Sequence, residues 1–246
     1  MQLTFTHPIA IGLTFVLAGV VKGVTGMGLP TVAMALLGLW MPPAQAAAVL
    51  IIPSLVTNVW QFLSGPHRLA LLLRIWPMLL MICLATTAGA GLLTGTESGR
   101  ASSWLGAALV IYAVIGLARV RFSLPPRYEP WLSPIVGAVT GVVTGATGVF
   151  VIPAVPYLQA LEFDKDDLVQ VLGLSFTAST VALAAGLASR GAFHMTAMTT
   201  STVAVAPALM GMGIGQLIRA KTDPDSPDSE SRSCRNSAPP RRRAAH

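Results

Sequence analysis

Charged residues are scarce in this chain of 246 residues, of which 53% are hydrophobic and only 11% are Asp, Glu, Lys or Arg. Soluble domains carry roughly 25% charged residues, so this composition excludes an ordinary soluble domain. Six long apolar runs and a shorter seventh lie at 8–29, 43–64, 71–93, 132–151, 167–189, 195–218 and 103–119. Because roughly 20 apolar residues cross a bilayer as a helix, we predict an all-α, multi-pass membrane protein.

Cysteine, histidine and acidic residues inside the apolar runs are also scarce. Cys83 lies in an apolar run and Cys234 in the polar C-terminal tail, which argues against a disulfide framework. The four histidines lack metal-ligand spacing, so we expect no metal and no cofactor. An intramembrane enzyme needs a nucleophile beside a base or paired carboxylates. The interiors of the apolar runs offer neither, so we predict that the protein is not an enzyme.

The chain does contain an internal repeat. A shift of 122 residues places GVVKGVTG (19–26) over GVVTGATG (141–148). The same ungapped shift superposes Thr57-Asn58 on Ser179-Thr180, and Gly89-x-Gly91 on Gly211-x-Gly213. Self-similarity at a fixed period predicts duplicated structural units. We predict a first unit over 1–120, a polar linker over 121–131 and a second unit over 132–222.

The second unit lacks a counterpart of the apolar run at 103–119. The shift carries that run onto 225–241, which is polar and rich in Ser, Pro and Arg. Such a composition cannot bury a core, so we predict a disordered polar tail over 223–246. Two explanations stay open: a lineage that lost its last helix, or a truncation or reading-frame shift near residue 222 that would leave an inactive protein.

Each Gly-rich block is followed by a short apolar segment, at 29–40 and 152–161. Both segments are too short to cross a bilayer comfortably, and both begin at or near a proline that suits the first turn of a helix. We predict a broken helix in each unit, with the last helix of the second unit missing. Paired Gly/Pro-interrupted segments in two repeats indicate a transporter binding site, because the start of a half-helix attracts anions.

Lys22 is the only charged residue in 8–64. A charge at the bilayer centre costs roughly 3 kcal/mol on insertion scales, so we expect Lys22 to attract an anion at the break. The alternative is that its amine snorkels to the membrane interface. The glycines at 19, 23, 141 and 145 also fit close helix packing without a binding role.

The predicted site joins Lys22 to hydrogen-bonding groups beside both breaks and on the polar face of 43–64. Ser and Thr on that face can bond their own helix, whereas Asn58 and Gln61 call for other partners. Its members are Lys22, Thr25, Gly26, Gly28, Asn58, Gln61, Thr147 and Gly148.

The doubled G-x-x-K/T-G-x-T-G block, followed by a short helix that starts at proline, closely resembles the sulfite exporter TauE/SafE family of membrane permeases. The resemblance spans residues 8 to about 222. It implies export of sulfite or organosulfonates across the bacterial cytoplasmic membrane, so the expected partners are a small sulfur oxyanion and the lipid bilayer, without nucleic acid. Phe150 departs from the motif glycine found at Gly28, which predicts a narrower second half of the site.

Two rivals remain beside a midplane anion permease. A non-transporting membrane scaffold fits the glycine motifs but gives no reason for a lysine beside a helix break. A channel would show high, weakly saturable flux.

The basic loops at 65–74 and 119–130 are expected on the cytoplasmic side.

Overall fold

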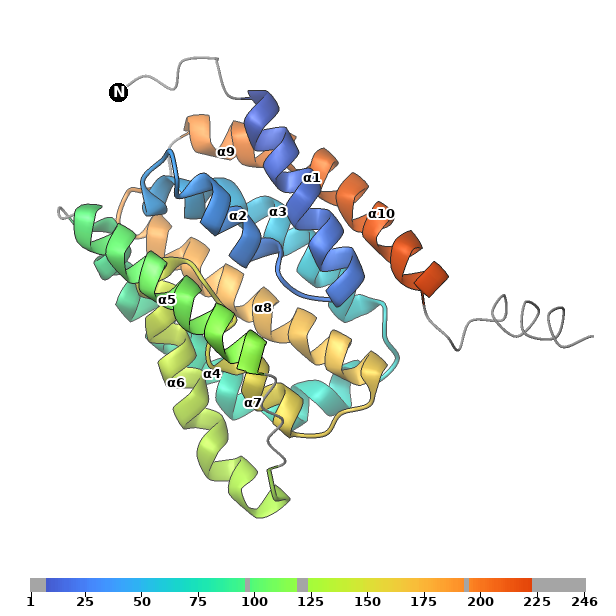
Figure 1. Cartoon of the computed structure of the whole chain (residues 1–246). Coiled ribbons are helices and arrows are strands. Elements are labelled where there is room, and N and C mark those ends of the chain that lie inside the picture. The colour runs from blue at the N-terminus through green and yellow to red at the C-terminus, as the bar shows by residue number, and fades with distance from the viewer. Residues whose placement is uncertain (1–7, 96–97, 119–123, 193–194, 223–246) are drawn as a thin grey trace, which may run out of the picture.

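The computed structural model describes residues 8–95, 98–118, 124–192 and 195–222. Within these ranges the chain is all helical, without strands, which confirms the predicted fold class (Figure 1). The elements are α1 (Pro8–Thr25), α2 (Leu29–Leu37), α3 (Pro43–Leu63), α4 (Arg68–Thr94), α5 (Ser98–Ala118), η1 (Pro126–Tyr128), α6 (Glu129–Thr147), α7 (Ala154–Ala160), α8 (Lys165–Ala188), α9 (Met195–Val203) and α10 (Val205–Thr222). The predicted polar tail at 223–246 lies outside the described residues.

Five helices of the described chain are long and apolar enough to cross a membrane. They are α1, α3, α4, α8 and the stretch Ala197–Lys221, which runs through α9 and α10. The predicted run at 132–151 folds as α6 but falls outside this set, and α5 contributes a shorter apolar helix at Arg100–Ile115. The multi-pass prediction is therefore confirmed, with fewer full-length spans than the seven apolar runs suggested.

The last predicted run is interrupted rather than straight. Helix α9 ends at Val203 and α10 begins at Val205. Pro207 lacks an N–H, and its ring crowds the carbonyl four residues earlier, that of Val203. The proline therefore accounts for the change of direction between α9 and α10 (Figure 1).

Helices α3 and α8 form the centre of the bundle. In their most apolar stretches 61% and 67% of the residues are buried, against 33% in α1, α4 and Ala197–Lys221. The outer helices instead expose large apolar side chains, such as Leu17 on α1 and Leu84 on α4. Exposed apolar side chains on long helices suit contact with lipid, so α3 and α8 are the helices that can hold a polar site away from it.

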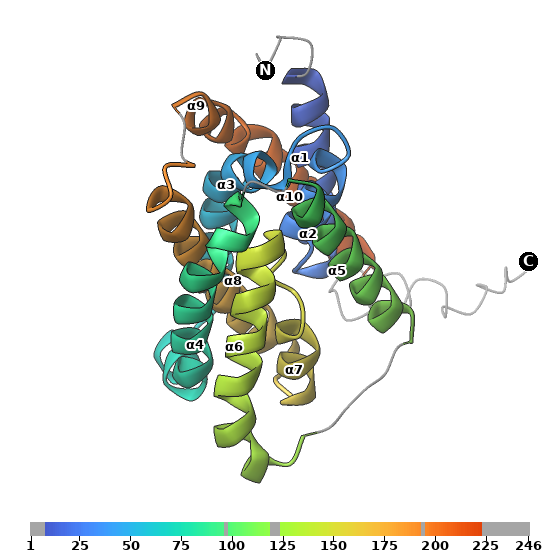
Figure 2. The ribbon, with the colours of Figure 1, turned by 90° about the vertical axis from the view of Figure 1, so that its left-hand side faces the viewer.

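Two tightly packed helix pairs flank this centre, α1 with α10 (Figure 1) and α4 with α6 (Figure 2). A Cβ placed on Gly23 would lie 2.3 Å from the backbone oxygen of Met212. A Cβ on Gly145 would lie 2.6 Å from the carbonyl carbon of Gly89. Small residues allow backbones to approach this closely in membranes, so the packing role of the repeated glycines is confirmed.

The contacts of the two pairs correspond, but with a changed register. Gly23 lies against Met212 and Gly215, whereas Gly145 lies against Thr86 and Gly89. Gly89 therefore makes the contact in its pair that Gly215 makes in the other pair. The ungapped shift had instead paired Gly89 with Gly211, which lies four residues before Gly215. Four residues are roughly one helical turn, so the difference leaves the same helix face in contact. The duplication itself stays a prediction.

Both predicted helix breaks are present, with tighter bounds than the sequence suggested. Helix α1 ends at Thr25, and Gly26 and Gly28 adopt φ values of 77° and 102° before α2 begins. Helix α6 ends at Thr147 and is capped by Gly148 with φ 73°. Only glycine adopts such φ values freely. At 1.5 Å per residue, α2 spans about 14 Å, half of the hydrocarbon thickness.

We predict that Gly23→Ala destabilises the protein by about 1–3 kcal/mol, because the added methyl group must push α10 away. The matched control is Gly12→Ala on the same helix, where a Cβ meets nothing within 4 Å. Thermal unfolding in detergent should show a lower midpoint for Gly23→Ala than for the native protein. Gly12→Ala should keep the native midpoint. Equal midpoints for the two variants would contradict the close approach of α1 and α10.

Candidate functional site

Lys22 lies inside the bundle and does not snorkel to an interface. Its side chain is 1% exposed. The amine Nζ donates to Thr57 Oγ1 at 3.1 Å and also to Asn58 Oδ1, both on α3. The alternative of an interfacial lysine is therefore wrong.

The two acceptors are held in place by their own hydrogen bonds on α3. The Thr57 hydroxyl donates to the carbonyl of Pro53 at 2.8 Å, which leaves its lone pairs for Lys22. The Asn58 amide donates through Nδ2 to Ser54 Oγ at 3.0 Å, which turns Oδ1 toward Lys22. Both side chains are fully buried. The sequence of α3 thus presents two oriented oxygens to one amine.

The hydrogen bonds continue from α3 to α8. Ser54 Oγ lies 3.2 Å from Thr180 Oγ1. Thr180 donates its own hydrogen to the Phe176 carbonyl at 2.7 Å, so Ser54 is the donor in the contact between the two hydroxyls. A buried chain of hydrogen bonds therefore runs from α1 to the two central helices, α3 and α8. Its members are Lys22, Asn58, Ser54 and Thr180.

Gln61 lies one turn further along α3 and bridges the first break to α8. Its Nε2 donates to the carbonyl of Gly26 at 2.7 Å and to that of Val169 at 2.7 Å. The other amide atom, Oε1, is buried and has no hydrogen-bond partner. Such an unpaired acceptor is uncommon in protein interiors.

No carboxylate neutralises Lys22 among the described residues. His67 pairs with Asp167 and Arg74 pairs with Glu129, and neither contact includes Lys22. Burying a charge is costly unless it is paired. The ammonium is therefore suited to pair with an anion that comes from outside the protein.

The remaining predicted residues lie around the breaks and make other contacts. Thr25 is exposed, and its hydroxyl bonds the Val21 and Met27 carbonyls of its own turn. Gly28 lies against Val21. The Thr147 hydroxyl donates to the Val143 carbonyl at 2.7 Å. Gly148 lies against Met34 of α2 and Ala47 of α3. These four shape the breaks, and no hydrogen bond among the described residues joins them to Lys22.

The second break is filled by aromatic side chains. Phe150 and Phe176 are both buried, and their rings lie 6.2 Å apart at 57°. Thr144, the repeat counterpart of Lys22, has backbone partners instead of side-chain ones: its hydroxyl lies 2.7 Å from the Thr140 carbonyl and 3.3 Å from the Val149 carbonyl. The two halves of the predicted site are therefore chemically unlike.

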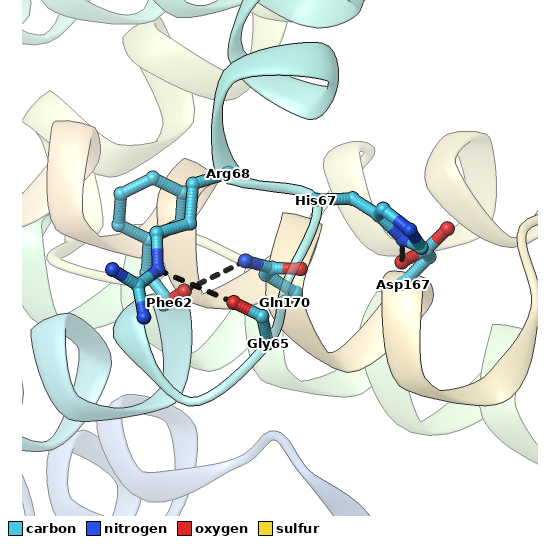
Figure 3. A network of polar contacts seen from close by, with 6 residues as sticks. All are labelled: Phe62, Gly65, His67, Arg68, Asp167 and Gln170. Atoms are coloured by element: carbon cyan, nitrogen blue, oxygen red, sulfur yellow. Dashed lines mark hydrogen bonds and ion pairs between the residues drawn. The ribbon is translucent and has the colours of Figure 1, made fainter.

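A second polar cluster ties the α3–α4 loop to the start of α8 (Figure 3). Gln170 donates to the Phe62 carbonyl at 2.9 Å, and His67 Nδ1 lies 2.8 Å from Asp167 Oδ1. Arg68 donates to the Leu63 carbonyl within the loop. We call the contact between α3 and α8 the α3–α8 seam. Because Phe62 follows Gln61, this cluster joins the two helices at the outer end of that seam.

Two open recesses of the described surface lie away from Lys22. One, of about 270 Å³, lies beside α4 and α5 and is lined in part by Arg100, Trp104 and Ala146. The other, of about 250 Å³, is lined in part by Gln45 and Thr94. Neither lining includes Lys22, Asn58 or Gln61. Lys22, Asn58 and Gln61 are all buried, so the cluster is closed to solvent in this conformation.

Three residues that contact this cluster were not among the predicted site members: Ser54, Thr57 and Thr180. Helical spacing placed Ser54 and Thr57 on the polar face that carries Asn58, and Thr180 on the polar face of the corresponding helix in the second unit. The spacing could not indicate that Thr57 accepts from Lys22 or that Ser54 contacts Thr180, because both contacts join helices distant in the chain.

The fold and the buried polar chain define a multi-pass helical membrane protein with a lysine buried at its centre. A family model described as sulfite exporter TauE/SafE matches residues 11–226. The chain therefore belongs to the sulfite exporter TauE/SafE family, a family of membrane transporters, as its motifs had indicated. Comparisons with curated proteins and with solved structures found no match.

We predict that the effects of the single change Lys22→Met and of Asn58→Leu on stability are not additive, because the two side chains contact each other. The single change leaves Asn58 Oδ1 buried without its donor, at a cost of about 1–3 kcal/mol, and replacing both partners by apolar groups removes most of that cost. Thermal unfolding of the four proteins of this double-mutant cycle measures the coupling. Additive losses would contradict the contact between Lys22 and Asn58.

Proposed function

We propose that the protein is a permease that exports small sulfur oxyanions, sulfite or organosulfonates, and binds them beside Lys22 between its two units. Membrane transport by an exporter-type protein follows from the family. The observation that carries the proposed site is the buried Lys22 amine, which contacts neutral oxygens and no carboxylate of the described chain. We place this activity in a bacterial cytoplasmic membrane, in keeping with the family resemblance.

The proposed roles divide between charge and shape. Lys22 attracts the anion, and Asn58 and Gln61 orient the groups around it. Thr25, Gly26 and Gly28 form the turn after α1, and Thr147 and Gly148 form the turn after α6. These turns contact the central helices, since Gly26 lies against Val169 of α8 and Gly148 lies against Ala47 of α3. They are a suitable place for the alternating opening of a transporter, because broken helices line the sites of many such proteins.

None of the acidic residues of the described chain is buried or contacts Lys22. Glu129, Glu162, Asp164, Asp166 and Asp167 occupy the starts of α6 and α8 and the loop before α8. An anion entering the seam therefore meets the field of Lys22 without a buried carboxylate that would oppose it. This charge distribution favours an anion over a cation as the transported species.

We predict saturable flux of sulfite in proteoliposomes of the native protein, reduced about tenfold or more in Lys22→Gln, since the ion pair with the substrate is lost. The matched control is Lys165→Gln, because Lys165 lies in the first turn of α8 and is exposed. Its flux should equal that of the native protein.

Other results would select the rivals. Absence of flux above that of protein-free liposomes would favour a scaffold or an inactive form. Flux that stays proportional to concentration would indicate a channel. Equal losses in both lysine variants would contradict a specific role for Lys22.

A further inference from the structure

Gln61 carries an acceptor that the protein itself leaves unused. Its side chain is 5% exposed, and both hydrogens of its amide are engaged by the Gly26 and Val169 carbonyls. Turning the amide over would set Oε1 against two carbonyl oxygens, which accept and cannot donate. The orientation is therefore fixed, and Oε1 remains buried without a donor.

This acceptor lies in the same seam as Lys22. Gln61 follows Thr57 by one turn of α3, and Gly26 follows Lys22 by four residues, directly after the end of α1. The contacts of Lys22 with Thr57 and of Gln61 with Gly26 are thus successive contacts between the same two segments, about 5.4 Å apart along the helix.

Lys22, in turn, has a hydrogen-bond donor that the protein leaves unused. An ammonium group has three N–H donors, and Thr57 and Asn58 engage two of them. The seam therefore offers one cationic donor and, about one turn away, one neutral acceptor. A ligand that satisfies both carries a negative charge and also keeps an O–H donor.

We infer that the site selects a sulfur oxyanion that still carries one O–H group, hydrogensulfite, whose O–H donates to Gln61 Oε1 while its charged oxygens face Lys22. This inference rests on the proposed function and narrows its substrate class. Organosulfonates and the sulfite dianion lack an O–H on the charged sulfur group, so they leave the Gln61 acceptor unpaired. A buried unpaired acceptor is penalised strongly enough to discriminate between such anions.

Methanesulfinate is the probe that isolates the O–H group. It has the charge of hydrogensulfite, with a methyl group in place of the hydroxyl. In proteoliposomes at a pH where hydrogensulfite is abundant, native protein should transport sulfite about tenfold faster than methanesulfinate at equal low concentration. Protein-free liposomes correct for passive leak. Equal rates for the two anions would overturn the inference and leave the proposed function standing.

The variant that tests the acceptor is Gln61→Met, which keeps the side-chain length and removes the amide. Its ratio of sulfite to methanesulfinate flux should fall toward one. The matched control is Gln170→Met, since Gln170 Oε1 is also buried and unpartnered but lies by Gly65 at the outer end of the seam (Figure 3). This control should keep the native ratio. A fall of the ratio in both variants, or in neither, would overturn the role of Gln61.

A measurement on native protein alone keeps the inference testable if Gln61→Met does not fold. Raising the pH converts hydrogensulfite to sulfite dianion and removes its O–H, whereas methanesulfinate does not change charge. Sulfite flux should fall with that conversion relative to methanesulfinate flux. A sulfite flux that rises relative to methanesulfinate would overturn the inference, and flux of neither anion would overturn the proposed function with it.

Discussion

The amine of Lys22 is buried at the centre of the bundle without a carboxylate partner, and the polar groups of the central helices are arranged around it. Lys22 is 1% exposed, and its contacts are with the side-chain oxygens of Thr57 and Asn58. A charge in such a place is costly in any membrane protein. The surrounding hydrogen bonds reduce this cost without neutralising the charge, which leaves a field suited to an anion.

The architecture around Lys22 serves to keep that place polar and closed. Helices α3 and α8 supply the hydroxyl and amide groups, and they are the most buried of the long helices. The close glycine contacts of α1 with α10 and of α4 with α6 brace them on either side. Because these backbones approach within van der Waals distance, small movements of one helix of a pair must involve the other.

The two halves of the molecule share a plan but differ in chemistry. Each has a long helix that ends at a glycine with positive φ, followed by a short helix. In the first half the break lies beside Lys22 and Gln61, whereas in the second half Phe150 packs on Phe176. A transporter built in this way holds one charged centre and one apolar wall, so its two sides need not move or bind alike.

Hydropathy, glycine and an unpaired charge act locally in the chain, so the membrane class, the helix breaks and the isolation of Lys22 could be predicted from the amino-acid order. Asn58 and Gln61 could also be recognised there as polar groups that local bonds do not satisfy. The packed helices were needed to show that Asn58 faces Lys22, that Ser54 meets Thr180, that Gln61 keeps a free acceptor and that Gly89 corresponds to Gly215 in its contacts. Each of these depends on the rotation and register of one helix against another, and many registers are compatible with the same apolar pattern.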